Sequence, residues 1–141
     1  MALLLEDLTR KVIGSFFFVY AKLGDGLLEN AYSGALDLSL TAKGISVKRE
    51  MPVAVHFEGV VVGNYRADLL VDNRLIVEVK TGAAITESHE RQLRNYLRCS
   101  EIEVGLILLF GPKPSFRRFI YTNDRKQIVL NSVPRVFPPI Q

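Results

Sequence analysis

Two aliphatic runs separated by a short polar break constrain this chain more than any other feature. Residues 60–71 read VVVGNYRADLLV and residues 74–80 read RLIVEVK, with Asp72-Asn73 between them. Runs rich in β-branched residues on either side of a turn signal predict two strands joined in a hairpin. The fold is therefore expected to contain an antiparallel strand pair over residues 60–80.

Three other segments have the features of helices. Apolar residues recur every three to four positions over residues 3–22, which is the period of a helix with one apolar face. A second helix is expected over residues 27–43, with Asp25 as its N-cap. A third is expected over residues 87–99, with Thr86 as its N-cap.

Further strands are expected on both sides of the hairpin. Residues 45–59 read either as one strand or as two strands broken near Pro52. Residues 103–111 and 115–122 are also expected to be strands. The order of helix, helix, several strands, helix, strand and strand predicts a mixed α+β or α/β fold.

Composition agrees with one globular domain over residues 1–141, ending in an extended proline-rich tail over residues 132–141. Hydrophobic residues make up 48% of the chain and charged residues 23%, which excludes a disordered protein. Cys99 is the only cysteine, so no internal disulfide is expected and the cytoplasm is favoured. The apolar run at 104–110 is too short to span a bilayer. The net charge of +3 permits a nucleic-acid partner.

The charged residues of the hairpin can share one face of the sheet. Side chains alternate along a strand, so Glu78 and Lys80 point the same way. Asp68 lies opposite Glu78 only if the hairpin loop has an odd number of residues, such as 72–74. A two-residue loop would instead set Asp68 opposite Val77 and separate the acids.

Two adjacent carboxylates on a half-buried surface repel each other, and one tends to take up a proton. A divalent cation removes this repulsion, since hard cations prefer carboxylate oxygens. Such a cation also activates water and stabilises charge on a phosphate. Lys80 beside it could orient the water, help to deprotonate it or neutralise the oxyanion. The alternative is that Asp68, Glu78 and Lys80 form an ordinary surface ion pair, worth about 0–1 kcal/mol.

Four motifs in order resemble the GxxExxY protein family, which is assigned to the PD-(D/E)xK nuclease superfamily. Asp68, nine residues and then Glu78-Val79-Lys80 are similar to the nuclease signature, with Ala67 where the superfamily name has proline. The hairpin sequence around them belongs to the same resemblance. Upstream, GLLENAY matches G-x-x-E-x-x-Y, and downstream, HERQLRNY matches H-x-x-Q-x-x-x-Y. The motif-bearing core covers residues 23–122.

The resemblance implies a restriction-endonuclease-like core with a central mixed sheet of about four to five strands flanked by helices. It implies a site for Mg²⁺ or Mn²⁺, formed by Asp68, Glu78, the Val79 backbone carbonyl and Glu29. Lys80 and Gln92 complete the implied catalytic set. The residues expected to contact nucleic acid are Tyr96, His89, Tyr32 and Arg66.

Several of these residues also have a structural interpretation. Glu29 as a first-turn acid is stabilised by the helix dipole by about 0.3–1 kcal/mol without any catalytic role. If Gly26 is the N-cap, Glu29 is the third helical residue; if Asp25 is the N-cap, Glu29 lies one residue further into the helix. Tyr32 could equally be a core tyrosine, and His89 could hydrogen-bond the start of its helix. The helical arginines at 91, 94 and 98 could contact phosphates or simply be solvated.

These features together predict a Mg²⁺-dependent nuclease or nuclease-like enzyme acting on nucleic-acid phosphodiesters, with DNA favoured over RNA. The alternative is a non-catalytic nucleic-acid-binding or assembly module that keeps the nuclease fold. A homodimer or a larger protein partner could supply the surface that a chain of this size lacks. No membrane partner is expected.

Overall fold

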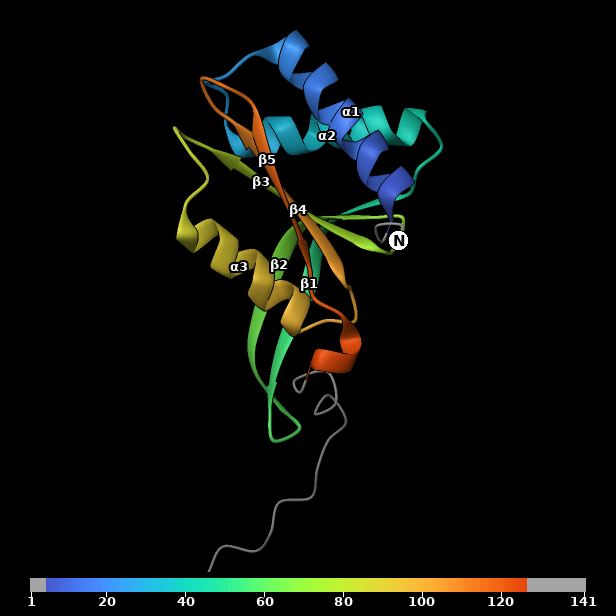
Figure 1. Cartoon of the computed structure of the whole chain (residues 1–141), viewed down its shortest axis with the longest axis vertical. Helices are drawn as coiled ribbons and strands as arrows, with labels where there is room; N and C mark the ends of the chain where they lie inside the picture. Colours follow the sequence, from blue (N-terminus) through green and yellow to red (C-terminus); the bar gives the residue numbers. More distant parts are fainter. Residues whose placement is uncertain (1–4, 127–141) are drawn as a thin grey trace, which may run out of the picture.

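The computed structural model describes residues 5–126, which form one five-stranded sheet with helices on both faces (Figure 1). The elements in chain order are α1 (Glu6–Leu23), α2 (Glu29–Ala42), β1 (Val47–Phe57), β2 (Val60–Val71), β3 (Leu75–Thr81), α3 (Glu87–Arg98), β4 (Val104–Phe110), β5 (Ser115–Ile120) and a 3₁₀ turn, η1 (Asn123–Arg125). The sheet order follows the chain from β1 to β5. Only β3 and β4 pair in parallel among these strands. The predicted mixed sheet flanked by helices is confirmed, and the predicted tail lies outside the described residues.

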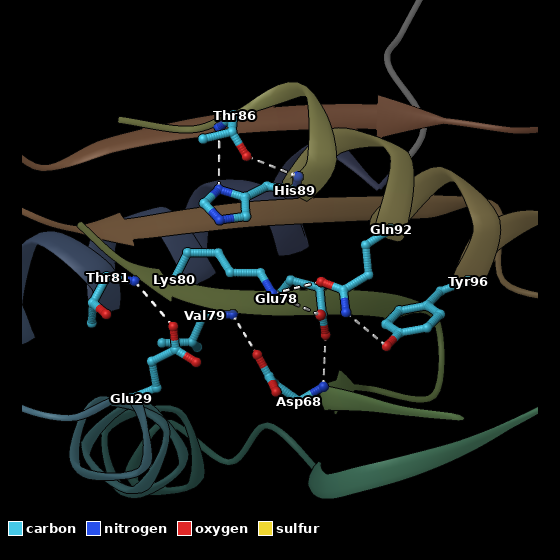
Figure 2. Close-up of polar contacts among 10 residues, drawn as sticks. All are labelled: Glu29, Asp68, Glu78, Val79, Lys80, Thr81, Thr86, His89, Gln92 and Tyr96. Carbon is cyan, nitrogen blue, oxygen red and sulfur yellow. Dashed lines mark hydrogen bonds and ion pairs between the residues drawn. The ribbon is translucent and has the colours of Figure 1, made fainter. Parts of the chain in front are cut away.

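Alternate residues of β3 divide between two hydrophobic cores. Leu75 and Val77 pack with α1 and α2 on one face of the sheet. Ile76 packs with α3 on the other face. Since strand side chains alternate, Glu78 and Lys80 belong to the face that α3 covers (Figure 2).

A glycine lets α3 approach the sheet closely. A Cβ atom added to Gly105 of β4 would lie only 2.6 Å from Cδ1 of Leu93, a buried residue of α3. The missing side chain therefore leaves the space that Leu93 fills. This packing sets the height of α3 above the strands and hence the position of Gln92, the residue directly before Leu93.

The start of α2 differs from the prediction. The helix begins at Glu29 and has no side-chain cap, so the prediction of Asp25 as N-cap is wrong. Instead, the Tyr32 hydroxyl donates to the Gly24 carbonyl (2.7 Å) and accepts from the Leu27 N–H (3.2 Å). A buried tyrosine thus holds the preceding loop in the place that a capping side chain would take.

Two other local predictions concern α3 and β1. Thr86 is the N-cap of α3 and forms a reciprocal capping box with His89. The Thr86 N–H donates to Nδ1 of His89, and the His89 N–H donates to Oγ1 of Thr86, each at 3.2 Å. This confirms the predicted cap. Residues 47–57 form one strand despite Pro52, because β1 lies at the edge of the sheet, where a residue without an N–H is tolerated.

Candidate active site

The hairpin register brings the two acids together. The last cross-strand partners on this side of the hairpin are Leu69 and Val77, and the loop consists of residues 72–74. The same register continued by one residue sets Asp68 opposite Glu78. The three-residue loop has the odd length that this register needs, and the alternative of a two-residue loop at Asp72-Asn73 is wrong.

Side chains replace the backbone ladder where the acids meet (Figure 2). The Asp68 N–H donates to Oε2 of Glu78 at 2.7 Å, and the Val79 N–H donates to Oδ2 of Asp68 at 2.7 Å. One oxygen of each carboxylate is therefore fixed by the opposite strand. The other Asp68 oxygen makes no hydrogen bond to any residue between 5 and 126, so it remains able to accept a ligand.

A short chain of contacts positions the lysine. Nζ of Lys80 lies 3.8 Å from Oε1 of Glu78 and donates to Oε1 of Gln92 at 2.5 Å. The amide nitrogen of Gln92 donates in turn to the Tyr96 hydroxyl at 3.1 Å. Gln92 and Tyr96 are four residues apart on α3 and so share one face of the helix. The structure brings Lys80 and Gln92 together, and Tyr96 orients the amide.

Burial and mutual repulsion dominate the electrostatics of the acids. Burial, followed by the charge of Asp68, raises the pKa of Glu78 to about 8. Burial also raises the pKa of Asp68, against the opposing effects of the Val79 N–H and the Lys80 charge. Two negative charges side by side are therefore disfavoured in this site, and an added cation would relieve the repulsion.

Glu29 lies at the border of this cluster. Its carboxylate accepts a hydrogen bond from the Thr81 N–H at 3.2 Å, at the end of β3 (Figure 2). It is the first residue of α2, so both predicted places, as the third or the fourth helical residue, are wrong. Across residues 5–126, no three histidine, cysteine or acidic side chains come close enough together to hold a metal. Asp68 and Glu78, which are linked by hydrogen bonds across β2 and β3, form a pair of carboxylates and not a complete ligand set by themselves.

Tyr32 does not face the site. Its side chain is fully buried and stacks on Phe110, with ring centroids 4.0 Å apart. Both hydrogen-bonding capacities of its hydroxyl are used by the loop before α2. The prediction that Tyr32 contacts nucleic acid is corrected to a core role, because no part of the ring is accessible.

The other predicted contact residues remain near the site or on the surface. His89 has its Nδ1 engaged by the Thr86 N–H, and its ring lies beside Lys80 in Figure 2. Burial, with a contribution from Lys80, lowers the pKa of His89, which favours a neutral ring. Arg66 is exposed and lies 3.8 Å from the Glu50 carboxylate.

Sequence reasoning missed two contributors to this region. One is the Thr81 N–H, which fixes Glu29 and carries no side-chain signal. The other is Tyr65, a 54% exposed aromatic residue that lines a groove next to Gln92 and Tyr96. Strict alternation would place Tyr65 and Asp68, three residues apart, on opposite faces of β2, so the sequence pattern gave no signal for this placement.

The fold and the acid pair define a nuclease-like protein. The sequence matches the PD-(D/E)XK nuclease superfamily over residues 6–119, and the chain belongs to this superfamily.

Two solved structures resemble the chain. The structure titled "Crystal structure of SSO0001" is 18% identical to this chain, with a TM-score of 0.52. The match covers 90% of this chain but only 65% of that one. Hjc, a Holliday junction resolvase from Archaeoglobus fulgidus, is 19% identical with a TM-score of 0.41, and the match covers 64% of this chain and 75% of that one. No curated protein matches the sequence. The first likeness supports the fold alone.

Proposed function

We propose that this chain is a metal-dependent nuclease of the GxxExxY type that hydrolyses phosphodiester bonds in nucleic acid. The observation that carries the proposal is the meeting of Asp68 and Glu78 across two strands, with the Lys80 amine beside them. Membership of a nuclease superfamily supports the same reaction class.

The donor set fits a divalent cation, which nucleases of this superfamily generally use. Each carboxylate has one oxygen fixed by backbone, and both pKa values are raised, so a cation would relieve an existing repulsion. Asp68, Glu78 and the Val79 carbonyl would hold Mg²⁺ or Mn²⁺, with Glu29 acting through water. When bound, the cation would lower the pKa of a water and offset charge on the phosphate.

Lys80 aligns the attacking water. One of its three N–H bonds is given to Gln92, and the other two can reach a water or a phosphate oxygen. Its positive charge offsets the charge that develops as water attacks phosphorus in line and the P–O3′ bond breaks, leaving a 5′-phosphate and a 3′-hydroxyl. Gln92 is a positioning residue, because it acts through Lys80.

Nucleic acid is the proposed partner, with DNA favoured over RNA. The net charge of +3 permits binding to a polyanion. In the described part of the chain, no helix is long and apolar enough to cross a membrane. A homodimer or a larger protein would extend the surface available to the substrate.

Calorimetric titration combined with cleavage assays tests the proposal. Mg²⁺ or Mn²⁺ should bind the wild type and lose most affinity in Asp68→Ala, whereas Asp72→Ala, which changes an acid in the hairpin loop, should bind normally. Lys80→Ala should keep its metal affinity and lose turnover on single- and double-stranded DNA and RNA. Unchanged binding in Asp68→Ala would remove the site. Binding without cleavage of any substrate would favour the non-catalytic module.

A further inference from the structure

A groove continues from the candidate active site along the junction between α3 and the β1–β2 hairpin. Its volume is about 420 Å³, and Gln92 and Tyr96 line it. These two residues also form the contact chain to Lys80. A ligand in the groove would therefore adjoin a phosphate held at the acids.

The strand side of the groove is apolar and aromatic. Val53, Val55 and Tyr65 line it, and the Tyr65 side chain is 54% exposed. A Cβ atom added to Gly63, two residues before Tyr65, would lie 3.2 Å from Cε2 of that ring. The tyrosine ring thus rests against backbone that has no side chain, beside an apolar floor. Such a surface suits the stacking of a planar ring.

The helix side of the groove is polar and positive. Arg91, Asn95 and Arg98 line it. Arg91 forms no ion pair or hydrogen bond with residues 5–126, whereas Arg94 on the same helix pairs with Glu90. The Asn95 side chain likewise has no hydrogen-bond partner in this range, and it offers both a donor and acceptors. One wall thus carries a free cation and a free amide.

We propose that this groove binds an unpaired nucleobase next to the scissile phosphate, so that the preferred substrate is single-stranded or has an unpaired nucleotide at the cleavage site. This inference rests on the proposed nuclease function. The base stacks on Tyr65, its edge bonds to Asn95, and Arg91 contacts a neighbouring phosphate. The volume lies within the range of small-molecule sites. A base inside a continuous duplex has both faces already stacked and must first leave the stack, which costs about a few kcal/mol.

The charges favour this occupant over an apolar peptide. A peptide segment on the apolar floor would leave Arg91 without an anion, whereas a nucleotide brings a planar ring and a phosphate together. The shared chemistry is the unpaired base, which DNA and RNA both provide. The same binding assay run on DNA and on RNA oligonucleotides therefore shows which of the two nucleic acids the groove prefers.

Binding of 12-nucleotide strands with a central 2-aminopurine, in EDTA, tests the groove without cleavage. Single strands should bind at least about tenfold more tightly than the same sequence in a blunt duplex, with quenching of the fluorescent base. Tyr65→Ala should weaken single-strand binding by about 5–150-fold and relieve the quenching, while Tyr65→Phe keeps both. Phe18→Ala, which removes an aromatic exposed on α1, is the matched control and should change nothing.

A second variant pair tests the cation. Arg91→Gln should lower the affinity and reduce the salt slope by about one, whereas Lys22→Gln on α1, with the same change in charge, should not. Equal binding of duplex and single strand, or unchanged affinity in Tyr65→Ala and Arg91→Gln, would overturn the inference and assign the groove to another partner. Normal binding without any cleavage would contradict the nuclease proposal and leave the base site standing.

Discussion

Glu78 links the chemistry of the site to the stability of the fold. Its folded-state pKa of about 8 is above its ordinary value of 4.5, so the folded protein holds this proton more tightly than the unfolded chain. The resulting stabilisation is fully present below pH 4.5 and is lost as the pH rises to about 8. The same carboxyl must be ionised to bind a cation, so proton and metal compete for it.

Glu78→Gln should remove this pH dependence. In EDTA, the free energy of unfolding of the wild type should fall between pH 5 and pH 8 relative to that of the variant, because the neutral amide does not ionise. Urea denaturation at pH 5, 6.5 and 8 measures the difference. Glu101→Gln, an exposed acid near the end of α3, should follow the wild type. A difference between Glu78→Gln and wild type that stays constant with pH would contradict the raised pKa of Glu78.

Gln92 offers a separate test of positioning. Gln92→Leu removes the acceptor that holds the Lys80 amine, and turnover should fall by about 10–100-fold. Metal affinity should change little, since Gln92 contacts neither acid through any observed hydrogen bond. Tyr96→Phe removes only the partner of the amide and should have a smaller effect. Equal loss of metal affinity and turnover in Gln92→Leu would show that the residue supports the fold of the site instead.

At the level of elements, the height of α3 over the sheet depends on one missing side chain. Gly105→Ala places a Cβ atom 2.6 Å from Cδ1 of Leu93. At this distance the new methyl group must displace either the Leu93 side chain or the whole helix. Overpacking of this kind costs about 1–3 kcal/mol of unfolding free energy. Turnover should also fall, because Gln92 moves with α3.

Gly14→Ala provides the matched control for that change. Nothing lies within 4 Å of a Cβ atom added at Gly14 in α1, and alanine is the better helix former by about 0.5–1 kcal/mol. Thermal or urea denaturation should therefore show opposite signs for the two substitutions. Wild-type stability in Gly105→Ala would mean that the α3–β4 contact relaxes without cost.

Much of this arrangement could be predicted because its causes are local. Strand alternation gave the condition that only an odd loop sets Asp68 opposite Glu78, but the turn signal at Asp72-Asn73 equally allowed a two-residue loop. The cap at Thr86 follows from its side-chain chemistry. The start of α2 could not be predicted, because a tyrosine from the following turn replaces the cap. The match between Gly105 and Leu93 and the groove beside Tyr65 depend on which elements meet in space, and a single sequence does not specify those contacts.

At the scale of the whole molecule, the site exists only when the sheet and α3 are assembled. Asp68 belongs to β2, Glu78 and Lys80 to β3, and Gln92 to α3. The acids meet where the backbone pairing of β2 and β3 gives way to side-chain contacts. A cation bound there would join two strands of the central sheet, so binding and folding are coupled.

Divalent cations should therefore stabilise the entire described fold. A ligand that binds only the folded state adds about 2.7 kcal/mol to the unfolding free energy at one hundred times its dissociation constant. At pH 8 the wild type should gain this unfolding free energy in Mg²⁺ or Mn²⁺, and the gain should disappear when EDTA is added. The gain should be smaller at pH 6, where the proton on Glu78 must first be displaced. Asp68→Asn should gain little at either pH, and an equal gain in this variant would locate the stabilising cation elsewhere on the molecule.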